Sequence, residues 1–369
     1  MPYRPRDIYR GHRKFRLPLT IFLFVIAFII IGGVSMFFFL QRYVVYESSG
    51  VTLQLPGGTE QTSADEAILA TPTPTFEPVT VEIVWEDPDF SELDLGGWED
   101  LDTVQARFIP LDTVISPSMF STAVEAARAE GYSGVVLQMK DDSGRLAWPS
   151  AVSAAQAYGT AGSTDVSETI AALHEAGMTV AAQISCFADT LMWERNWPVA
   201  LQSGGSPYKD AEGKCWLDPY NRTIRTYLTD LALELAAMGF DEIILADLYH
   251  PISEAGFTYS ITLQTEADPV VAVCQAGRRV AEALEDTETA VSARLDADSL
   301  RNGLGDQTGQ DIDIFWRLFA RLYCPSGYDM AASDTELAVD AMNAGDSNIR
   351  FVPVSAYIPE GSESYVITS

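Results

Sequence analysis

From residue 104 onward, short apolar and β-branched runs alternate with amphipathic helical patterns, and this alternation limits the fold more than any other feature. Strands that are separated by helices run parallel in one sheet, which the helices cover. Seven such runs and a short eighth at Tyr365–Ser369 predict a (β/α)8 TIM-type barrel rather than a flat doubly wound sheet. The first seven predicted strands are Val104–Leu111, Gly134–Lys140, Thr179–Phe187, Glu242–Ala246, Thr289–Leu295, Phe319–Cys324 and Arg350–Ala356.

The helical segments between these strands carry termination signals. Glycine stands at or just beyond the end of three of them, at Gly131, Gly177 and Gly239, which is typical of helix C-caps. Only Tyr357–Ser364 separates the last two strands, which is too short for a covering helix, so we expect the barrel to be degenerate near the C-terminus. The predicted helices are Ser121–Glu130, Ser167–Ala176, Thr223–Met238, Val270–Leu284 and Asp334–Asn343.

The run Leu17–Leu40 contains 24 residues without a charge. As a helix it would be about 36 Å long, enough to cross a hydrocarbon core of about 30 Å. Six basic residues lie within residues 1–16, but only Arg42 follows closely, so we expect a cytoplasmic tail, one transmembrane helix at 17–40, and the rest outside the cell membrane. A cleaved signal peptide is the alternative, although its apolar region usually has only about 7 to 15 residues.

Residues 41–102 read as a linker and neck. From Glu47 to about Pro78 the chain is rich in Gly, Ser, Thr and Pro, and the alternation Thr71-Pro72-Thr73-Pro74-Thr75 favours an extended spacer. Val79–Asp102 mixes a short alternating pattern with acidic turns, which indicates a neck or an edge hairpin. The remaining residues, 103–369, form the predicted barrel domain.

Composition excludes several classes of function. The net charge is −29, and it is −35 beyond Tyr46, so a nucleic-acid partner is not expected. Of the histidines, only His174 and His250 lie beyond the apolar run, and the four cysteines show no C-x-x-C spacing, so we expect no metal site, no cofactor and buried free thiols, with one disulfide as the alternative. No G-x-G-x-x-G or Walker loop follows any predicted strand, which disfavours nucleotide-binding folds.

The chemistry of a barrel of this type lies where its strands end and the following loops begin. Carboxylates gather there among tryptophans and tyrosines, a combination that suits a sugar site because aromatic faces stack on pyranose rings and paired carboxylates can act as acid and base or nucleophile. For any one residue, a helix cap or a core position is the competing interpretation. The candidate catalytic residues are Asp247, Asp141 and Asp189, and the candidate substrate-binding residues are Lys140, Asp142, Trp148, Trp193, Trp216, His250, Tyr323 and Tyr328.

Several motifs occur in the order and spacing of one known family. Leu217-Asp218-Pro219-Tyr220 resembles its W-x-N-P-Y, Gly239-Phe240-Asp241-Glu242-Ile243 its G-F-D-E-I, Gly309-Gln310-Asp311 its G-Q-D, and the segments 135–144 and 322–328 its V-V-I-D-V-K-D-x-x-G and M-x-Y-P-S-H-Y. Over about residues 104–369 the chain resembles the putative glycoside hydrolase family of TIM-barrel domains, first catalogued as a domain of unknown function. The resemblance implies a barrel that acts on polysaccharide or another glycan.

The departures from the family pattern concern its polar floor. Gln138 stands where the family carries Asp, Gln183 where it carries Arg, Ala246 where it carries an acid, Tyr249 where it carries Arg, and Gly327 where it carries His. Five such changes together imply that the ancestral hydrolytic arrangement has been dismantled.

Asp247 could replace the missing acid only if a bulge or a turn at the strand end directs it into the barrel mouth, because adjacent strand residues point to opposite sides. Paired with Asp141 or Asp189 within about 10 Å, it could still act as acid or base. We therefore expect a membrane-anchored domain that engages a cell-surface or extracellular glycan, with hydrolysis as the inherited reaction. The alternative is an inactive carbohydrate-binding or protein-binding scaffold.

Overall fold

The computed structural model describes residues 44–47, 50–53, 101–254, 256–259, 268–297, 304–325, 347–359 and 362–368. The chain divides into two compact units, Met1–Ile83 and Val84–Ser369. Among the described residues no helix is both long and apolar enough to span a membrane, and the predicted transmembrane run Leu17–Leu40 lies outside them.

The first unit contains an antiparallel hairpin. Strand β1 (Val44–Glu47) pairs with β2 (Gly50–Leu53), so four residues of the predicted spacer form a strand. The Thr-Pro alternation and the segment Val79–Asp102, except for its last two residues, lie outside the described residues.

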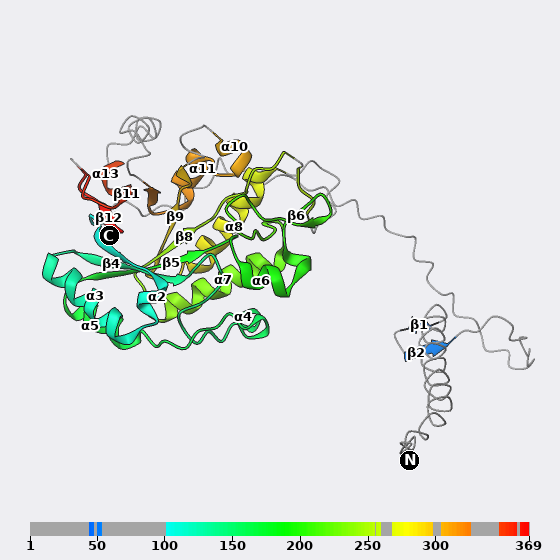
Figure 1. Ribbon diagram of the computed structural model, residues 1–369, viewed down its shortest axis with the longest axis horizontal. Helices are drawn as coiled ribbons and strands as arrows, with labels where there is room; N and C mark the ends of the chain where they lie inside the picture. The colour runs from blue at the N-terminus through cyan, green and yellow to red at the C-terminus, as the bar shows by residue number, and fades with distance from the viewer. Residues whose placement is uncertain are drawn as a thin grey trace, which may run out of the picture. The chain divides into compact units, whose positions relative to one another are not determined.

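The second unit is a closed barrel of eight strands, and the parallel strand pairs confirm the (β/α)8 prediction (Figure 1). The ring runs in the order β10-β11-β12-β3-β4-β5-β8-β9. Every predicted strand is present. β4 and β8 have the predicted ends, and the ends of the other strands differ from the prediction by a few residues. The strands are β3 (Gln105–Ile109), β4 (Gly134–Lys140), β5 (Thr179–Ser185), β8 (Glu242–Ala246), β9 (Ala290–Arg294), β10 (Leu322–Pro325), β11 (Phe351–Ser355) and β12 (Tyr365–Ile367).

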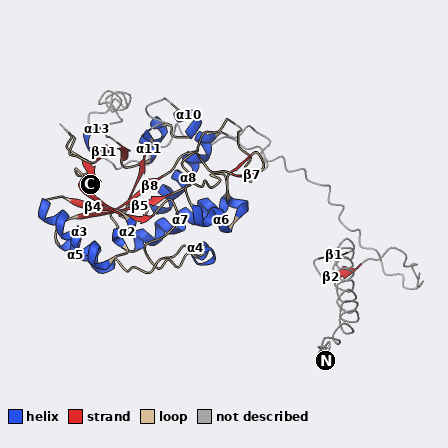
Figure 2. Cartoon of the chain, in the orientation of Figure 1, coloured by secondary structure: helices blue, strands red, loops and turns tan. Residues whose placement is uncertain are grey.

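Helices pack around the outside of the strands (Figure 2). Four of them match predicted helices, and α3 begins earlier than expected, with a proline in its first turn. The glycines that follow three helices have φ values of +83° at Gly131, +72° at Gly177 and +93° at Gly239, as the C-cap prediction requires. These four helices are α3 (Pro117–Glu130), α5 (Ser167–Glu175), α7 (Arg222–Ala237) and α8 (Pro269–Leu284).

Shorter elements were not predicted and lie mainly in the loops that follow strands. The described part of the connection between β11 and β12 contains no helix, whereas the predicted helix Asp334–Asn343 lies outside the described residues. The short elements are α2 (Leu111–Val114), α4 (Ser153–Tyr158), α6 (Thr190–Arg195), η2 (Trp197–Val199), β6 (Gln202–Ser203), β7 (Ser206–Pro207), α10 (Gly305–Thr308), α11 (Ile312–Leu318) and α13 (Ser347–Arg350).

Two apolar clusters form the core, and strand alternation explains the division. The larger cluster fills the layer between strands and helices and takes Val135 and Leu137 from β4. The smaller cluster lies among residues of the opposite strand faces, including Val136 of β4, Ala181 of β5 and Ile244 of β8. Because this cluster fills the barrel interior, the space left for a ligand lies at an end of the barrel.

Candidate functional site

Asp247 lies one residue beyond β8, where the backbone turns out of the strand. Its φ is +49°, and it is the one non-glycine residue with a positive φ in the part of the chain that the structure describes. In a regular strand Ala246 and Asp247 would point to opposite faces. With this left-handed turn, both residues line the same cavity. The structure therefore contains the turn at the strand end that Asp247 needs to face the barrel mouth.

The cavity has a volume of 320 Å³ and opens at the carboxyl ends of β4, β5, β8, β9 and β10. Among the described residues, three acidic and two basic ones line it, namely Asp142, Asp247, Asp296, Lys214 and Arg294. The other lining residues are Gln138, Gln183, Ser185, Ala246, Tyr249, Leu295, Ala297 and Pro325.

Two partners hold the Asp247 carboxylate, whose side chain is 18% exposed. The Ser185 hydroxyl donates to Oδ2 at 2.6 Å, and Lys214 Nζ donates to Oδ1 at 2.9 Å. Burial lowers the pKa of Lys214, but the neighbouring carboxylates, Asp247 first among them, outweigh burial, so the net pKa is raised. Lys214 therefore stays charged at neutral pH.

The same ammonium group brings a second carboxylate close to Asp247. Lys214 Nζ lies 2.9 Å from Asp247 Oδ1 and 3.9 Å from Asp142 Oδ2, so these two carboxylate oxygens are at most about 7 Å apart. This distance does not exceed the upper limit of about 9.5 Å at which glycosidase carboxyls work. The Asp142 side chain is 57% exposed at the cavity rim. The pair that the structure brings together is therefore Asp247 and Asp142.

A third carboxylate, Asp296, also lines the cavity and lies two residues after the end of β9. Asp296 also acts on Tyr249. Burial raises the pKa of the Tyr249 phenol, and the charges of Asp247 and Asp296 raise this pKa further. The phenol consequently stays protonated and can donate a hydrogen bond in the cavity. Gln310 braces these loops, since its Oε1 accepts from Asp296 N at 2.8 Å and its Nε2 donates to the Leu248 carbonyl at 3.1 Å.

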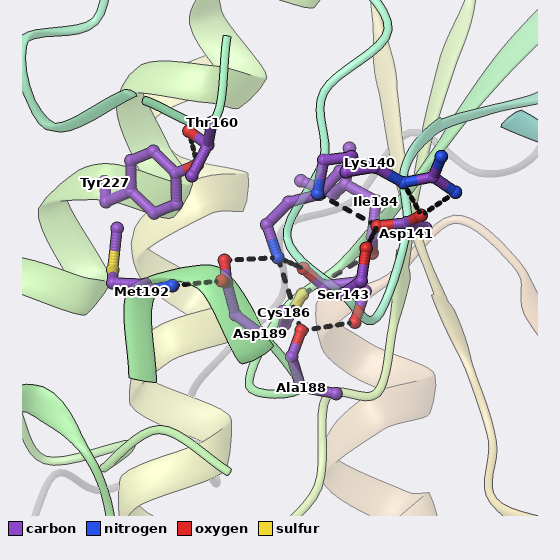
Figure 3. A network of polar contacts seen from close by, with 12 residues as sticks. Lys140, Asp141, Ser143, Thr160, Ile184, Cys186, Ala188, Asp189, Met192 and Tyr227 are labelled. Carbon is purple, nitrogen blue, oxygen red and sulfur yellow. Dashed lines mark hydrogen bonds and ion pairs between the residues drawn. The ribbon is translucent and has the colours of Figure 1, made fainter. Parts of the chain in front are cut away.

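Lys140, Asp141 and Asp189 lie together in a polar network apart from the cavity lining (Figure 3). Lys140 Nζ donates to the Ser185 carbonyl at 2.7 Å and forms a 3.0 Å ion pair with Asp189 Oδ2, and both side chains are fully buried. Asp189 Oδ1 also accepts from Met192 N at 2.8 Å, which caps α6.

A shift in the pairing register explains why the Lys140 side chain does not line the cavity. The pairing of β4 with β5 shifts between Gln138 and Lys140, so Gln138 reaches the cavity while Lys140 does not. Asp141 is held by the Arg145 side chain at 2.8 and 2.7 Å and by the Ser143 hydroxyl at 2.7 Å. The carboxylate that Lys214 links to Asp247 is Asp142, whereas the pairing of Asp247 with Asp141 or Asp189 stays a prediction.

The predicted sugar-binding tryptophans are engaged within the protein. Trp148 Nε1 donates to Glu234 at 3.0 Å, Trp193 Nε1 to the Tyr208 carbonyl at 3.0 Å, and Trp216 Nε1 to Asp210 at 2.9 Å. None of these three lines the cavity around Asp247. Trp216 nevertheless contributes to it indirectly, because its ring packs edge-on against Tyr249, with 4.8 Å between centroids.

His250 and Tyr323 are buried and lie outside the cavity lining. His250 contacts the Pro251 carbonyl and the Tyr259 hydroxyl through its two ring nitrogens. The Tyr323 hydroxyl donates to Glu242 Oε1 at 3.0 Å, and Glu242 is the first residue of β8, so this contact lies towards the amino ends of the strands. Tyr328 lies outside the described residues.

The predicted site residues do not include Lys214, Arg294, Tyr249, Ser185 or Asp296. Arg294 and Ser185 each end a strand and Asp296 follows one, so their position relative to the strands was a usable signal. Lys214 lies in a loop, remote from any barrel strand in sequence, and only the folded chain brings it to Asp247. All four cysteines are buried and free, and burial raises the thiol pKa of Cys186 and Cys274.

Comparison with known proteins adds a family and a shared fold. Residues 106–329 match the model of a family described as a putative glycosyl hydrolase domain. No curated protein matches the sequence.

Among solved structures, the glycoside hydrolase domain of PgaB (BpsB) from Bordetella bronchiseptica matches with a TM-score of 0.55 and 13% identity over 73% of this chain and 94% of that one. A hypothetical protein from Ruminiclostridium thermocellum is 25% identical over 51% of this chain and 96% of its own, with a TM-score of 0.44. The α-galactosidase from Lactobacillus brevis is 11% identical over 73% of this chain and 38% of its own, with a TM-score of 0.47.

Proposed function

The chain belongs to the family of putative glycosyl hydrolase domains, and on that basis we propose that its barrel binds a glycan in the cavity around Asp247 and hydrolyses a glycosidic bond there. The observation that carries this proposal is the left-handed turn at Asp247, which directs a carboxylate into a polar cavity of 320 Å³ at the carboxyl end of the barrel. A backbone conformation of this kind is unfavourable for an L-residue by about 1 to 3 kcal/mol, and such conformations concentrate at functional sites.

The geometry supports distinct roles for two carboxylates. Asp247 accepts hydrogen bonds from Lys214 and from the Ser185 hydroxyl, and a carboxylate held in this way suits a nucleophile or a general base. Asp142, at most about 7 Å away, is the carboxyl that would protonate the leaving oxygen or activate water. The Tyr249 phenol and Gln183 offer neutral hydrogen-bonding groups for sugar hydroxyls.

A second candidate function is glycan binding without bond cleavage. It is supported by the neutral floor of the cavity, where Gln138, Gln183 and Ala246 stand in place of the charged residues of the family pattern. Gln138 is also committed to the fold, because its Oε1 accepts from Leu111 N at 3.0 Å. In this case the cavity would hold a sugar and Asp247 would serve as a hydrogen-bond acceptor only.

The test measures reducing-sugar release by the full chain, purified in mild detergent, from soluble starch, dextran, arabinoxylan and galactomannan. We expect Asp247→Asn to lower kcat by about 100-fold or more, as the removal of a general acid, base or nucleophile does. Asp142→Asn and Asp296→Asn tell which carboxylate is the partner. Asp286→Asn, an exposed residue after α8, is the matched control and should leave the rate unchanged.

The outcomes separate the two candidates. Full activity in Asp247→Asn would refute the hydrolytic proposal. Binding of a polymer by the unaltered chain without any sugar release would instead favour the binding module.

We also propose that residues 17–40 anchor the chain in the cell membrane, with residues 1–16 on the cytoplasmic side and the barrel outside. The support is the length of the uncharged run and the basic residues that precede it. A barrel outside the cell would meet cell-surface or extracellular glycans, which agrees with the proposed substrate class.

A further inference from the structure

A second aromatic surface lies outside the cavity. A groove of 300 Å³ is lined by Trp197, Pro198, Ala200, Gln202 and Tyr259. Trp197, the first residue of η2, is 60% exposed and is the most exposed large apolar side chain in the described part of the chain. We call this surface the Trp197 groove.

The indole N–H of Trp197 differs in its hydrogen bonding from the indole N–H groups of Trp148, Trp193 and Trp216. The N–H groups of Trp148, Trp193 and Trp216 donate to acceptors within the protein. For Trp197, the hydrogen bonds within the described residues involve its backbone carbonyl only. One face of an indole and one donor are thus available at the surface, and an indole of this kind stacks readily on a sugar ring while its N–H binds a hydroxyl.

The groove is held rigid by its neighbours. Gln202 Nε2 donates to the Trp197 and Ala200 carbonyls at 3.3 and 3.1 Å, which fixes the backbone of η2. The Tyr259 hydroxyl contacts His250 Nε2 at 3.1 Å, and its ring packs edge-on against Tyr220 at 4.8 Å. A ligand would therefore meet a preformed surface and order few side chains on binding.

The chemistry of the groove indicates which ligand it takes. None of the described residues that line it carries a charge, although the whole chain has a net charge of −29. A partner protein with a basic surface would find its complement elsewhere on the molecule. Aromatic rings combined with neutral amide and indole groups match the apolar faces and the hydroxyls of uncharged sugars.

The same two chain segments form the Trp197 groove and the cavity. The segment after β5 carries Trp197 to the groove and Lys214 to the cavity, and the segment after β8 carries Asp247 to the cavity and Tyr259 to the groove. Thr258 N donates to the Gln202 carbonyl at 2.9 Å and joins the two segments. The cavity and the Trp197 groove are therefore built on the same two segments, which this contact ties together.

We propose that the Trp197 groove is a second glycan-binding site, which holds an uncharged stretch of the polymer whose other residues occupy the cavity. This inference rests on the proposed function. Its consequence is a preference for long chains over short oligosaccharides, because two linked sites raise the effective concentration of one end of the polymer once the other is bound.

The experiment compares polymer with oligosaccharide. The full chain in mild detergent is run in native gels that contain soluble starch, dextran, arabinoxylan or galactomannan, and the retardation by each polymer gives the dissociation constant. Sugar release from a trisaccharide of the retarding polymer is measured in parallel. The variants are Trp197→Ala and Trp197→Phe, with Met119→Ala, an exposed apolar residue on α3, as the matched control.

We expect Trp197→Ala to weaken polymer binding about tenfold, as loss of one stacked aromatic does, and to leave trisaccharide hydrolysis unchanged. Trp197→Phe should restore most of the affinity, and Met119→Ala should bind like the unaltered chain. Because Trp197 is exposed, we expect Trp197→Ala to unfold at the same thermal midpoint as the unaltered chain, which would confirm that the variant folds.

Unchanged polymer binding in Trp197→Ala would refute the second binding site. Loss of hydrolysis in Asp247→Asn would still support the proposed function of the cavity. Polymer binding that depends on Trp197 without any hydrolysis would uphold the groove and refute cleavage. If no polymer of the panel retards the unaltered chain, the groove proposal fails together with glycan binding.

Discussion

At Asp247 a left-handed backbone and a charged side chain occur in one residue. Glycine would adopt a φ of +49° without strain. Asp247 remains there in the structure with Ser185 at 2.6 Å and Lys214 at 2.9 Å, two charge-assisted contacts that offset the strain. The position of the carboxylate thus depends on side chains from two other segments of the chain.

His250 lies beside the site and is 2% exposed. Burial lowers its pKa to about 4, although the hydrogen bond to the Pro251 carbonyl acts in the opposite direction. The neutral ring fits this place, because one nitrogen can donate to Pro251 while the other accepts from the Tyr259 hydroxyl. Its protonation would remove that acceptor.

This residue predicts an acid-sensitive fold. An unfolded histidine titrates near 6.5, above the folded value of about 4, so the stability that neutral His250 contributes is present above pH 6.5 and is lost as the pH falls towards 4. The loss amounts to about 3 kcal/mol. Urea unfolding of the full chain at pH 7 and pH 4 should show a smaller loss in His250→Gln than in the unaltered protein.

The control for this measurement is His174→Gln on α5, an exposed histidine that pairs with Asp241. It should lose as much stability on acidification as the unaltered chain, because an exposed ion pair contributes little. Equal losses in all three proteins would contradict the role assigned to His250.

At the scale of elements, the loop after β4 packs directly on the start of α6. Gly144 has a φ of +90°, and a Cβ built there would lie 2.0 Å from Asp189 Oδ1. Asp189 cannot move away easily, since Met192 N and Lys140 Nζ hold it. This close approach locks the loops that follow two adjacent strands, β4 and β5.

Gly144→Ala should therefore be far more destabilising than another glycine replacement with a similar φ. Gly131→Ala is the matched variant, because Gly131 has a φ of +83° and nothing within 4 Å of its added Cβ. We expect a loss of about 1 to 2 kcal/mol in Gly131→Ala from backbone strain alone. Gly144→Ala should lose about 1 to 3 kcal/mol more from overpacking.

The free energy of unfolding of both variants, measured with urea, checks this prediction. Equal losses in the two would mean that the contact between Gly144 and Asp189 does not constrain the loops.

The element that follows β5 shows what periodicity leaves unpredicted. The segment between β5 and α7 contains α6, η2 and the short hairpin β6–β7, none longer than six residues. Elements this short carry too few residues for a periodic pattern. Yet this segment supplies Lys214 to the cavity and Trp197 to the groove.

At the scale of the whole molecule, the membrane anchor remains a prediction from the sequence. The variant Phe28→Asp with Ile29→Asp places two charges in the middle of the run Leu17–Leu40, at about 3 kcal/mol for each Asp. We expect the unaltered chain, translated with inverted inner-membrane vesicles, to resist alkaline extraction and to become protected from added protease. The double variant should lose both properties.

The matched control, Val44→Asp with Val45→Asp, adds the same charges outside the run and should insert normally. Extraction of the unaltered chain by alkali would refute the anchor. If residues 17–40 insert but the barrel is still cleaved by added protease, the proposed orientation is refuted.

The barrel and its strand positions were determined by the sequence itself, because strand and helix periodicities depend on residues that are near one another in the chain. The same holds for the C-cap glycines, since a helix end is a local structure. The location of the site at the carboxyl ends of the strands followed from the fold class.

Only the tertiary structure decided which carboxylates meet. The shift in pairing between Gln138 and Lys140 withdraws Lys140 into a buried ion pair with Asp189, and a turn of one residue brings Asp247 into the cavity. The charge that links Asp247 to Asp142 comes from Lys214, in a loop between other strands. Contacts of this kind depend on packing between segments far apart in the chain, and local patterns do not carry that information.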